Sequence, residues 1–127
     1  MLGKMTVAIG GKDYEIAATF RAGSLIHDRV GDPLTIMMDG AMSAINPDHK
    51  PEYSFDFVTS AKIIHAGLEA SGHDLALDAI GDAFIGKRLT DLSGYAARFI
   101  SLFGADDETV KAMDNVGREA GGDSGKK

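Results

Sequence analysis

The chain has 127 residues, enough for one domain that buries about two-thirds of the surface its unfolded form exposes. Its net charge of −6 argues against nucleic acid as the main partner, because phosphate binding needs a concentrated positive surface. Cysteine is absent, which excludes disulfides and thiolate metal sites. No apolar run approaches the roughly 18 residues of a membrane span, and the N-terminus lacks a signal-peptide pattern. We therefore expect a cytoplasmic protein that binds neither nucleic acid nor membrane.

Residues 5–20 are predicted to form a β-hairpin. Apolar side chains alternate with polar or small ones on both sides of a glycine pair, which is the period of a strand with one covered face. The side chains expected to face inward are Met5, Val7, Ile9, Tyr14, Ile16, Ala18 and Phe20. Gly10-Gly11-Lys12-Asp13 is the expected turn, since it offers residues that tolerate positive φ. A lone hairpin is marginally stable, so we expect it to pack on helices and to keep open outer edges.

Two helices are predicted next, over residues 20–30 and 33–45. Thr19 is the expected N-cap of the first helix, and Gly31 ends it. Asp32-Pro33 starts the second, with an N-cap followed by proline at the first helical position. The apolar residues of the second helix recur at helical spacing: Leu34, Met37, Met38, Ala41 and Ile45.

The helix predicted over residues 54–72 is the one around which we expect the others to pack. Ser54 suits its N-cap and Gly72 its C-terminal cap. Its apolar residues fall on most faces: Phe57, Val58, Ala61, Ile64 and Leu68 on one, and Phe55, Ile63, Ala66 and Ala70 on others. Such a helix is usually buried on several sides. The surrounding elements are predicted to be the hairpin and the helices over 20–30, 33–45 and 91–103.

Two more helices complete the prediction. One runs from His73-Asp74 to near Gly86, and the other is capped by Thr90 or Asp91 and ends at Gly104. The expected fold is α+β but mostly α, with an N-terminal hairpin packed on about five short helices in one domain over 1–104. Residues 105–127 are polar and rich in glycine, which predicts a tail with at most a short helix before disorder.

No residue pattern indicates catalysis. The four histidines lack the spacing that places two imidazoles on one helix face, so structural or solvated histidines are favoured over a metal site. Ser24 and His27 are residue types of a catalytic triad, but the G-x-S-x-G turn is missing. Asp74, Asp78 and Asp82 recur every fourth residue and are interpreted as a solvated helix face, rather than a site for a cation or a basic partner. We predict no catalytic, cofactor-binding or metal-binding residues, and the sequence does not identify the partner-binding ones.

Small residues are spaced along two of the predicted helices. They are Gly40-Ala41-x-x-Ala44 and Gly67-x-x-Ala70. Together with the open hairpin and the apolar helix faces, they suggest more apolar surface than a monomer of this size can easily bury. We therefore expect binding of apolar helical partners, or self-association into a homo-oligomer, rather than catalysis.

The chain resembles the small tail assembly chaperone-like proteins of gene transfer agents and of siphophage-type tail clusters, including those of prophages. The residues that carry the resemblance span about 5–104: Gly11-Lys12-x-Tyr14-x-Ile16, Thr19-Phe20-x-Ala22, Gly31 followed by Leu34, and Ala66-Gly67-Leu68-x-Ala70. In that family the first helix is usually richer in Leu and Glu, and Ser24 and His27 depart from this pattern.

The resemblance implies a non-enzymatic factor of virion assembly that binds the tape measure protein, and also the tail tube protein, while the tail is built. It implies no catalytic residue and no cofactor. Three alternatives stay open. They are a structural tail component, such as a tube or connector subunit that pairs through the hairpin edge; a small regulatory protein-binding module; and an enzyme of unrecognised type, which should have a deep polar pocket.

Overall fold

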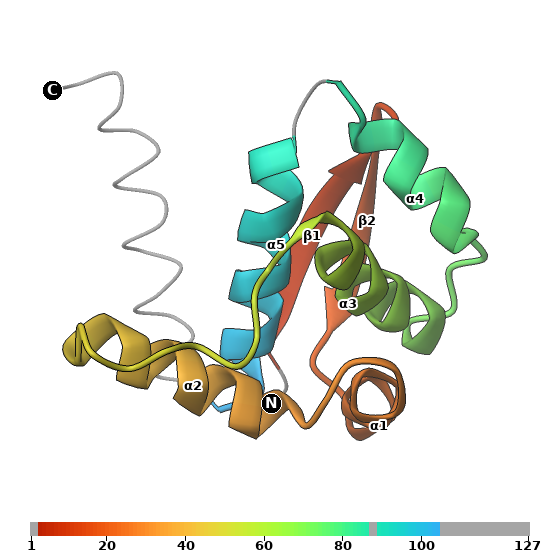
Figure 1. The fold of residues 1–127 in the computed structure, drawn as a ribbon. Coiled ribbons are helices and arrows are strands. Elements are labelled where there is room, and N and C mark those ends of the chain that lie inside the picture. Colours follow the sequence, from red (N-terminus) through yellow and green to blue (C-terminus); the bar gives the residue numbers. More distant parts are fainter. Residues whose placement is uncertain (1–2, 87–88, 105–127) are drawn as a thin grey trace, which may run out of the picture.

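The computed structural model describes residues 3–86 and 89–104. They form a hairpin followed by five helices, in the order β1-β2-α1-α2-α3-α4-α5, so the predicted α+β and mostly helical fold is confirmed (Figure 1). The predicted tail, residues 105–127, lies outside the described residues. Within residues 3–86 and 89–104, no helix is both long and apolar enough to cross a bilayer.

The hairpin pairs β1 (Lys4–Ile9) with β2 (Lys12–Ala17) in antiparallel register, with Ile9 opposite Lys12 beside the turn. Only Gly10 and Gly11 form the turn, and their φ values of 60° and 81° are those a type I′ turn requires. The four-residue turn predicted from the sequence is therefore wrong, because two consecutive glycines already reverse the chain and leave Lys12 free to pair.

One face of the hairpin is covered, as its alternation predicts. The buried side chains on this face are Met5, Val7, Ile9, Ile16 and Ala18. Phe20 does not belong to them: it is the first residue of α1 (Phe20–Arg29) and 91% exposed. The chain leaves the strand after Ala17, and the Thr19 hydroxyl then caps the helix by accepting from the Ala22 N–H at 3.0 Å. The strand alternation therefore ends before it reaches Phe20.

Helix α3 (Phe57–Ala70) lies in the middle of the molecule, with α1 beneath it and α4 beside it (Figure 1). Its N-cap is Asp56, not the predicted Ser54, because the Asp56 carboxylate accepts from the Thr59 N–H at 2.8 Å. At its other end Gly72 has a φ of 86°, and the His73 N–H donates to the Leu68 carbonyl at 2.9 Å. This pairing, with that of the Gly72 N–H to Glu69, is the Schellman arrangement that ends a helix.

The core is built where α3 meets α5 (Leu89–Leu102), α1, α4 (Leu77–Phe84) and β2. Gly67 of α3 permits a close approach of α5 and β2, since a Cβ there would lie 2.8 Å from Phe99 Cε2 and 3.1 Å from Ile16 Cδ1. The largest fully buried apolar side chains come from six of the seven elements: Val7, Ile16, Ile26, Ile63, Ile64, Leu68, Ile80, Leu92, Phe99 and Ile100.

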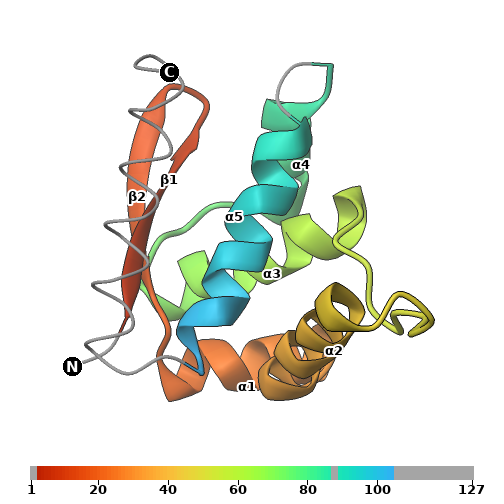
Figure 2. The ribbon, with the colours of Figure 1, turned by 90° about the vertical axis from the view of Figure 1, so that its left-hand side faces the viewer.

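Helix α2 (Pro33–Ile45) is the element that contributes none of them. It was predicted to surround α3, but it contacts α5 and α1 instead, at one end of the molecule (Figure 2). The place beside α3 is taken by α4, which the sequence did not assign to it.

The last two helices begin at other residues than predicted. Helix α4 starts at Leu77, not at His73-Asp74, because the His73 N–H caps α3 and its ring bonds the Glu15 carbonyl. Asp74 consequently precedes the helix, and only Asp78 and Asp82 remain of the predicted acidic stripe. Helix α5 starts at Leu89, so Thr90 and Asp91 lie in its first turn and do not precede it.

The outer edges of the hairpin are partly occupied by side chains of the helical layer. Three backbone groups of the strands form hydrogen bonds with these side chains. They are the Ala8 N–H with the Tyr95 hydroxyl (3.2 Å), the Ala17 N–H with Ser71 Oγ (3.3 Å) and the Glu15 carbonyl with His73 Nε2 (2.9 Å). A further strand could pair on either side only by displacing these bonds. The predicted open edges therefore exist only in part.

Candidate functional site

Helix α2 carries a row of exposed apolar side chains, which we call the α2 stripe: Leu34, Met38, Met42 and Ile45. Their spacing of four, four and three residues places them on one face of the helix. They are 50%, 61%, 41% and 78% exposed, whereas Ile36 on the opposite face is 2% exposed. A helix with two apolar faces needs two neighbours, and within residues 3–86 and 89–104 the neighbours of α2 lie on one side only.

The inner side of α2 is fixed at its first turns. Asp32 caps the helix, accepting from the Thr35 N–H at 3.0 Å and from the Thr35 hydroxyl at 2.9 Å, and Pro33 behind it is buried. Met37 lies against Gly104 at the end of α5, where a Cβ would overlap the methionine side chain. These contacts hold the α2 stripe in one orientation relative to the rest of the protein.

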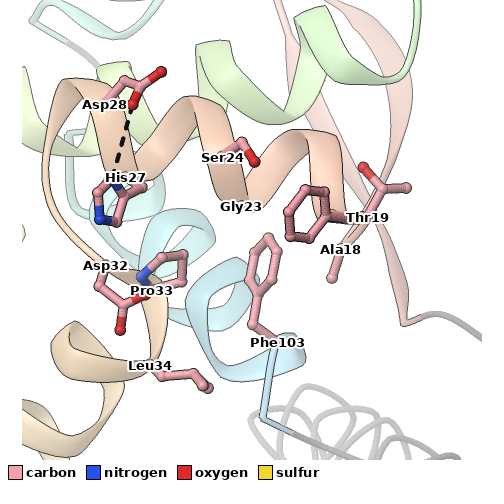
Figure 3. Close-up of a pocket in the computed structure, with 11 residues that line it drawn as sticks. Ala18, Thr19, Gly23, Ser24, His27, Asp28, Asp32, Pro33, Leu34 and Phe103 are labelled. Carbon is pink, nitrogen blue, oxygen red and sulfur yellow. Dashed lines mark ion pairs between the residues drawn. The ribbon is translucent and has the colours of Figure 1, made fainter.

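A groove of about 420 Å³ opens beside the first turn of α2 (Figure 3). Its lining comes from the end of the hairpin, α1, the start of α2 and the end of α5: Ala18, Thr19, Phe20, Gly23, Ser24, His27, Asp28, Asp32, Pro33, Leu34 and Phe103. Leu34 belongs both to the groove and to the α2 stripe, and the lining of the groove also includes the exposed Phe20. The stripe and the groove therefore form one continuous apolar surface.

The groove also gathers Ser24, His27, Asp28 and Asp32, the residue types of a triad, but not its geometry. His27 Nδ1 lies 3.7 Å from Asp28 Oδ1, too far for a hydrogen bond, and both side chains are largely exposed (Figure 3). Ser24 and His27 are not hydrogen-bonded to each other in the part of the chain that the structure describes. The Asp32 carboxylate already caps α2. Nothing in the groove activates Ser24 as a nucleophile.

The other three histidines each have a structural partner. His49 Nε2 donates to Asp39 at 2.8 Å, His73 Nε2 to the Glu15 carbonyl at 2.9 Å, and His65 Nδ1 lies 3.1 Å from an Arg29 nitrogen. Among the described side chains, no three His, Asp or Glu residues are grouped as metal ligands would be. The histidines thus link separate segments of the fold.

Asp39 joins α2 to the loop that leads into α3. Besides the His49 bond, its carboxylate accepts from the Glu52 N–H at 3.0 Å and the Tyr53 N–H at 3.1 Å. The His49 hydrogen bond, followed by that from Tyr53, lowers the pKa of Asp39 below its ordinary value of 3.8. The loop is therefore attached to the inner side of α2 and leaves the stripe uncovered.

The two small-residue segments found in the sequence have different surroundings. Gly67 lies in the core against Phe99, whereas a Cβ on Gly40 of α2 would meet nothing within 4 Å. Only the segment on α2 is therefore free to receive another chain. It continues the apolar surface of the stripe, because Ala41 is exposed between Met38 and Met42.

Sequence reasoning did not separate the α2 stripe from the core, and it counted Phe20 as an inward residue of the hairpin. The spacing of Leu34, Met38 and Ile45 was visible, but spacing alone does not say whether an apolar face is covered. No protein-family model, no curated protein and no solved structure matches this chain.

Proposed function

We propose that this protein is a non-enzymatic assembly factor that keeps an apolar helical segment of another protein in solution. The observation that carries the proposal is the α2 stripe, four large apolar side chains left exposed on a helix whose other side is fixed to the core. An exposed apolar surface of this kind on a small domain is typical of a protein-binding site.

The shape and chemistry of the surface suit a helical partner. An amphipathic helix binds through apolar side chains at i, i+3, i+4 and i+7. The stripe side chains are also three or four residues apart, so the apolar faces of two such helices can pack against each other. Met38 and Met42 are flexible and polarisable, so they adapt to different apolar sequences. The net charge of −6 favours solubility of the complex.

With the resemblance to tail assembly chaperone-like proteins, these features support the tape measure protein of a phage-type tail as the partner, bound in the cytoplasm. Such a partner is long and helical, and it exposes apolar faces until tube subunits enclose it. A surface that accepts many similar apolar segments suits it better than one deep, specific pocket does.

The test is co-expression with a helical fragment of the tape measure protein from the same tail gene cluster. The wild-type protein should raise the soluble fraction of the fragment and co-purify with it. Met38→Gln/Ile45→Gln should lose most of this effect while keeping its fold, because both positions are exposed. The matched control, Val58→Gln/Ile85→Gln, makes the same change at two exposed apolar positions outside α2 and should behave as the wild type. Equal activity of the stripe variant and the control would refute the proposal.

A structural tail component is the second candidate, and the hairpin edge was its sequence basis. The side-chain bonds to Ala8, Glu15 and Ala17 count against strand addition at either edge. Mass spectrometry of purified particles separates the two roles, since an assembly chaperone is absent from the finished particle and a tube or connector subunit is present in many copies.

A further inference from the structure

A second groove, separate from the α2 stripe, lies between the first turn of α3 and helix α4. Its volume is about 330 Å³, and its lining residues are Phe57, Val58, Ala61, Leu77, Asp78, Gly81, Asp82 and Ile85. Phe57, Val58 and Ile85 are 36%, 56% and 57% exposed. We call this surface the α3–α4 groove.

The groove exists because the apolar face of α3 is longer than the core that covers it. Ile64 and Leu68 on that face are fully buried, and Ala61 nearly so, but α4 covers the first turn only in part. Gly81 of α4 faces this turn, and a Cβ there would lie 3.5 Å from Phe57 Cζ. The missing side chain leaves room above the Phe57 ring.

The charged residues that line the groove are both acidic. Asp78 and Asp82 are exposed on α4, four residues apart, so they lie one turn apart on the same side of the helix. Neither carboxylate has an ion pair or hydrogen bond with the residues that the structure describes. The groove thus combines an apolar floor with two exposed acidic side chains along one edge.

We propose that the α3–α4 groove binds an amphipathic helix of a partner protein that carries basic residues one turn apart beside its apolar face. The apolar side chains of that helix cover Phe57, Val58 and Ile85, and its Lys or Arg residues pair with Asp78 and Asp82. Charge complementarity selects this occupant over an uncharged or acidic helix of the same apolar pattern. The protein then has two docking faces with different preferences.

Two synthetic peptides test the proposal on the full chain. Each is an Ala-based helix with a Leu stripe at i, i+3, i+4 and i+7, flanked by Lys four residues apart in one peptide and by Glu in the other. Fluorescence anisotropy should show tighter binding of the Lys peptide, and its NMR shift changes should fall on α3 and α4. Equal binding of both peptides, or shift changes confined to the α2 stripe, would overturn the proposal.

Three variants locate the binding. Asp78→Asn/Asp82→Asn should weaken the Lys peptide on the order of tenfold at low salt, as expected from losing two exposed ion pairs. Asp13→Asn/Glu15→Gln removes the same net charge from the exposed hairpin and should change affinity less than about twofold. Gly81→Leu fills the groove in a helix that tolerates leucine better than glycine, so it should abolish binding while circular dichroism stays native.

An equal loss in the two charge variants would mean non-specific attraction to an acidic protein and would refute the proposal, as would full binding by a folded Gly81→Leu protein. Met38→Gln/Ile45→Gln should bind the Lys peptide as the wild type does. Because this variant is the one expected to fail with the tape measure fragment, the two proposals can fail independently. Added Mg²⁺ or Ca²⁺ at 1:1 should not displace the peptide, and displacement would instead indicate a cation site.

Discussion

Helices α2 and α3 begin in the same way. An aspartate caps each of them, Asp32 through the Thr35 N–H at 3.0 Å and Asp56 through the Thr59 N–H at 2.8 Å. Both are rich in apolar residues, yet Ile63 and Ile64 of α3 are fully buried while Met38 and Ile45 of α2 are 61% and 78% exposed. Helix α3 packs against four elements, whereas the main helix contacts of α2 among the described residues are with α5 and α1.

The difference shows that an apolar helix becomes core or surface according to how many elements surround it. In α3 the apolar side chains beyond the first turn meet different neighbours on different sides, so their burial stabilises the fold. In α2 the second apolar face stays in water, where it contributes nothing to the stability of the monomer and remains available to another chain. Four experiments break or sharpen this contrast.

The largest effect is expected from Ile64→Asp compared with Ile45→Asp. A carboxylate at position 64 would be buried without a partner, which costs several kcal/mol against a total stability of about 5–15 kcal/mol. We expect that variant to lack a cooperative thermal transition by circular dichroism. Ile45→Asp, at an exposed position, should change stability by no more than about 0.5 kcal/mol. If Ile45→Asp unfolded the protein as well, the α2 stripe would be part of the core.

A smaller effect is expected from Gly67→Ala compared with Gly40→Ala. The new methyl at position 67 would meet the Phe99 ring at 2.8 Å, and overpacking costs about 1–3 kcal/mol, more than the gain of about 1 kcal/mol in helix propensity. Gly40→Ala gains the same propensity in open space and should stabilise the protein by about 1 kcal/mol. Urea midpoints at constant m-value measure both changes. If the urea midpoint moved in the same direction in both variants, the contrast between a packed Gly67 and an open Gly40 would be contradicted.

The smallest effect is expected from acid, through Asp39 and Glu69. Hydrogen bonds from His49 and Arg29, respectively, lower the pKa of these carboxyls below their ordinary values of 3.8 and 4.5. The contribution of these carboxylates to the stability of the fold is therefore complete at pH values above their ordinary pKa. It is lost as the pH falls through the lowered pKa of the folded state. The midpoint of thermal unfolding should not change with pH near neutrality and should decrease below about pH 4.

The variant Asp39→Asn tests whether Asp39 holds the loop beside α2 without affecting the core. At pH 6 it should shift the NMR amide signals of Glu52 and Tyr53, which lose a carboxylate acceptor, and leave those of Ile63 and Ile64 in place. Unchanged Glu52 and Tyr53 signals would show that Asp39 does not hold the loop.

Some features of this protein could be predicted because they depend on neighbours in the sequence. The alternation of Met5, Val7 and Ile9, the cap at Asp32-Pro33 and the helix end at Gly72 are local, and the structure confirms each of them. The errors of one to four residues at Asp56, Leu77 and Leu89 arose where several residues could begin a helix.

What only the tertiary structure decided is which apolar face is covered. Periodicity assigned Phe57, Val58 and Phe20 to the interior in the same way as Ile64, because hydropathy does not encode the number of neighbours. The positions of α2 and α4 depend on contacts between residues far apart in the chain, such as Met37 with Gly104 and Gly81 with Phe57. The sequence by itself determined the elements and most of the core, and the packing of those elements determined which apolar side chains were left as docking surfaces.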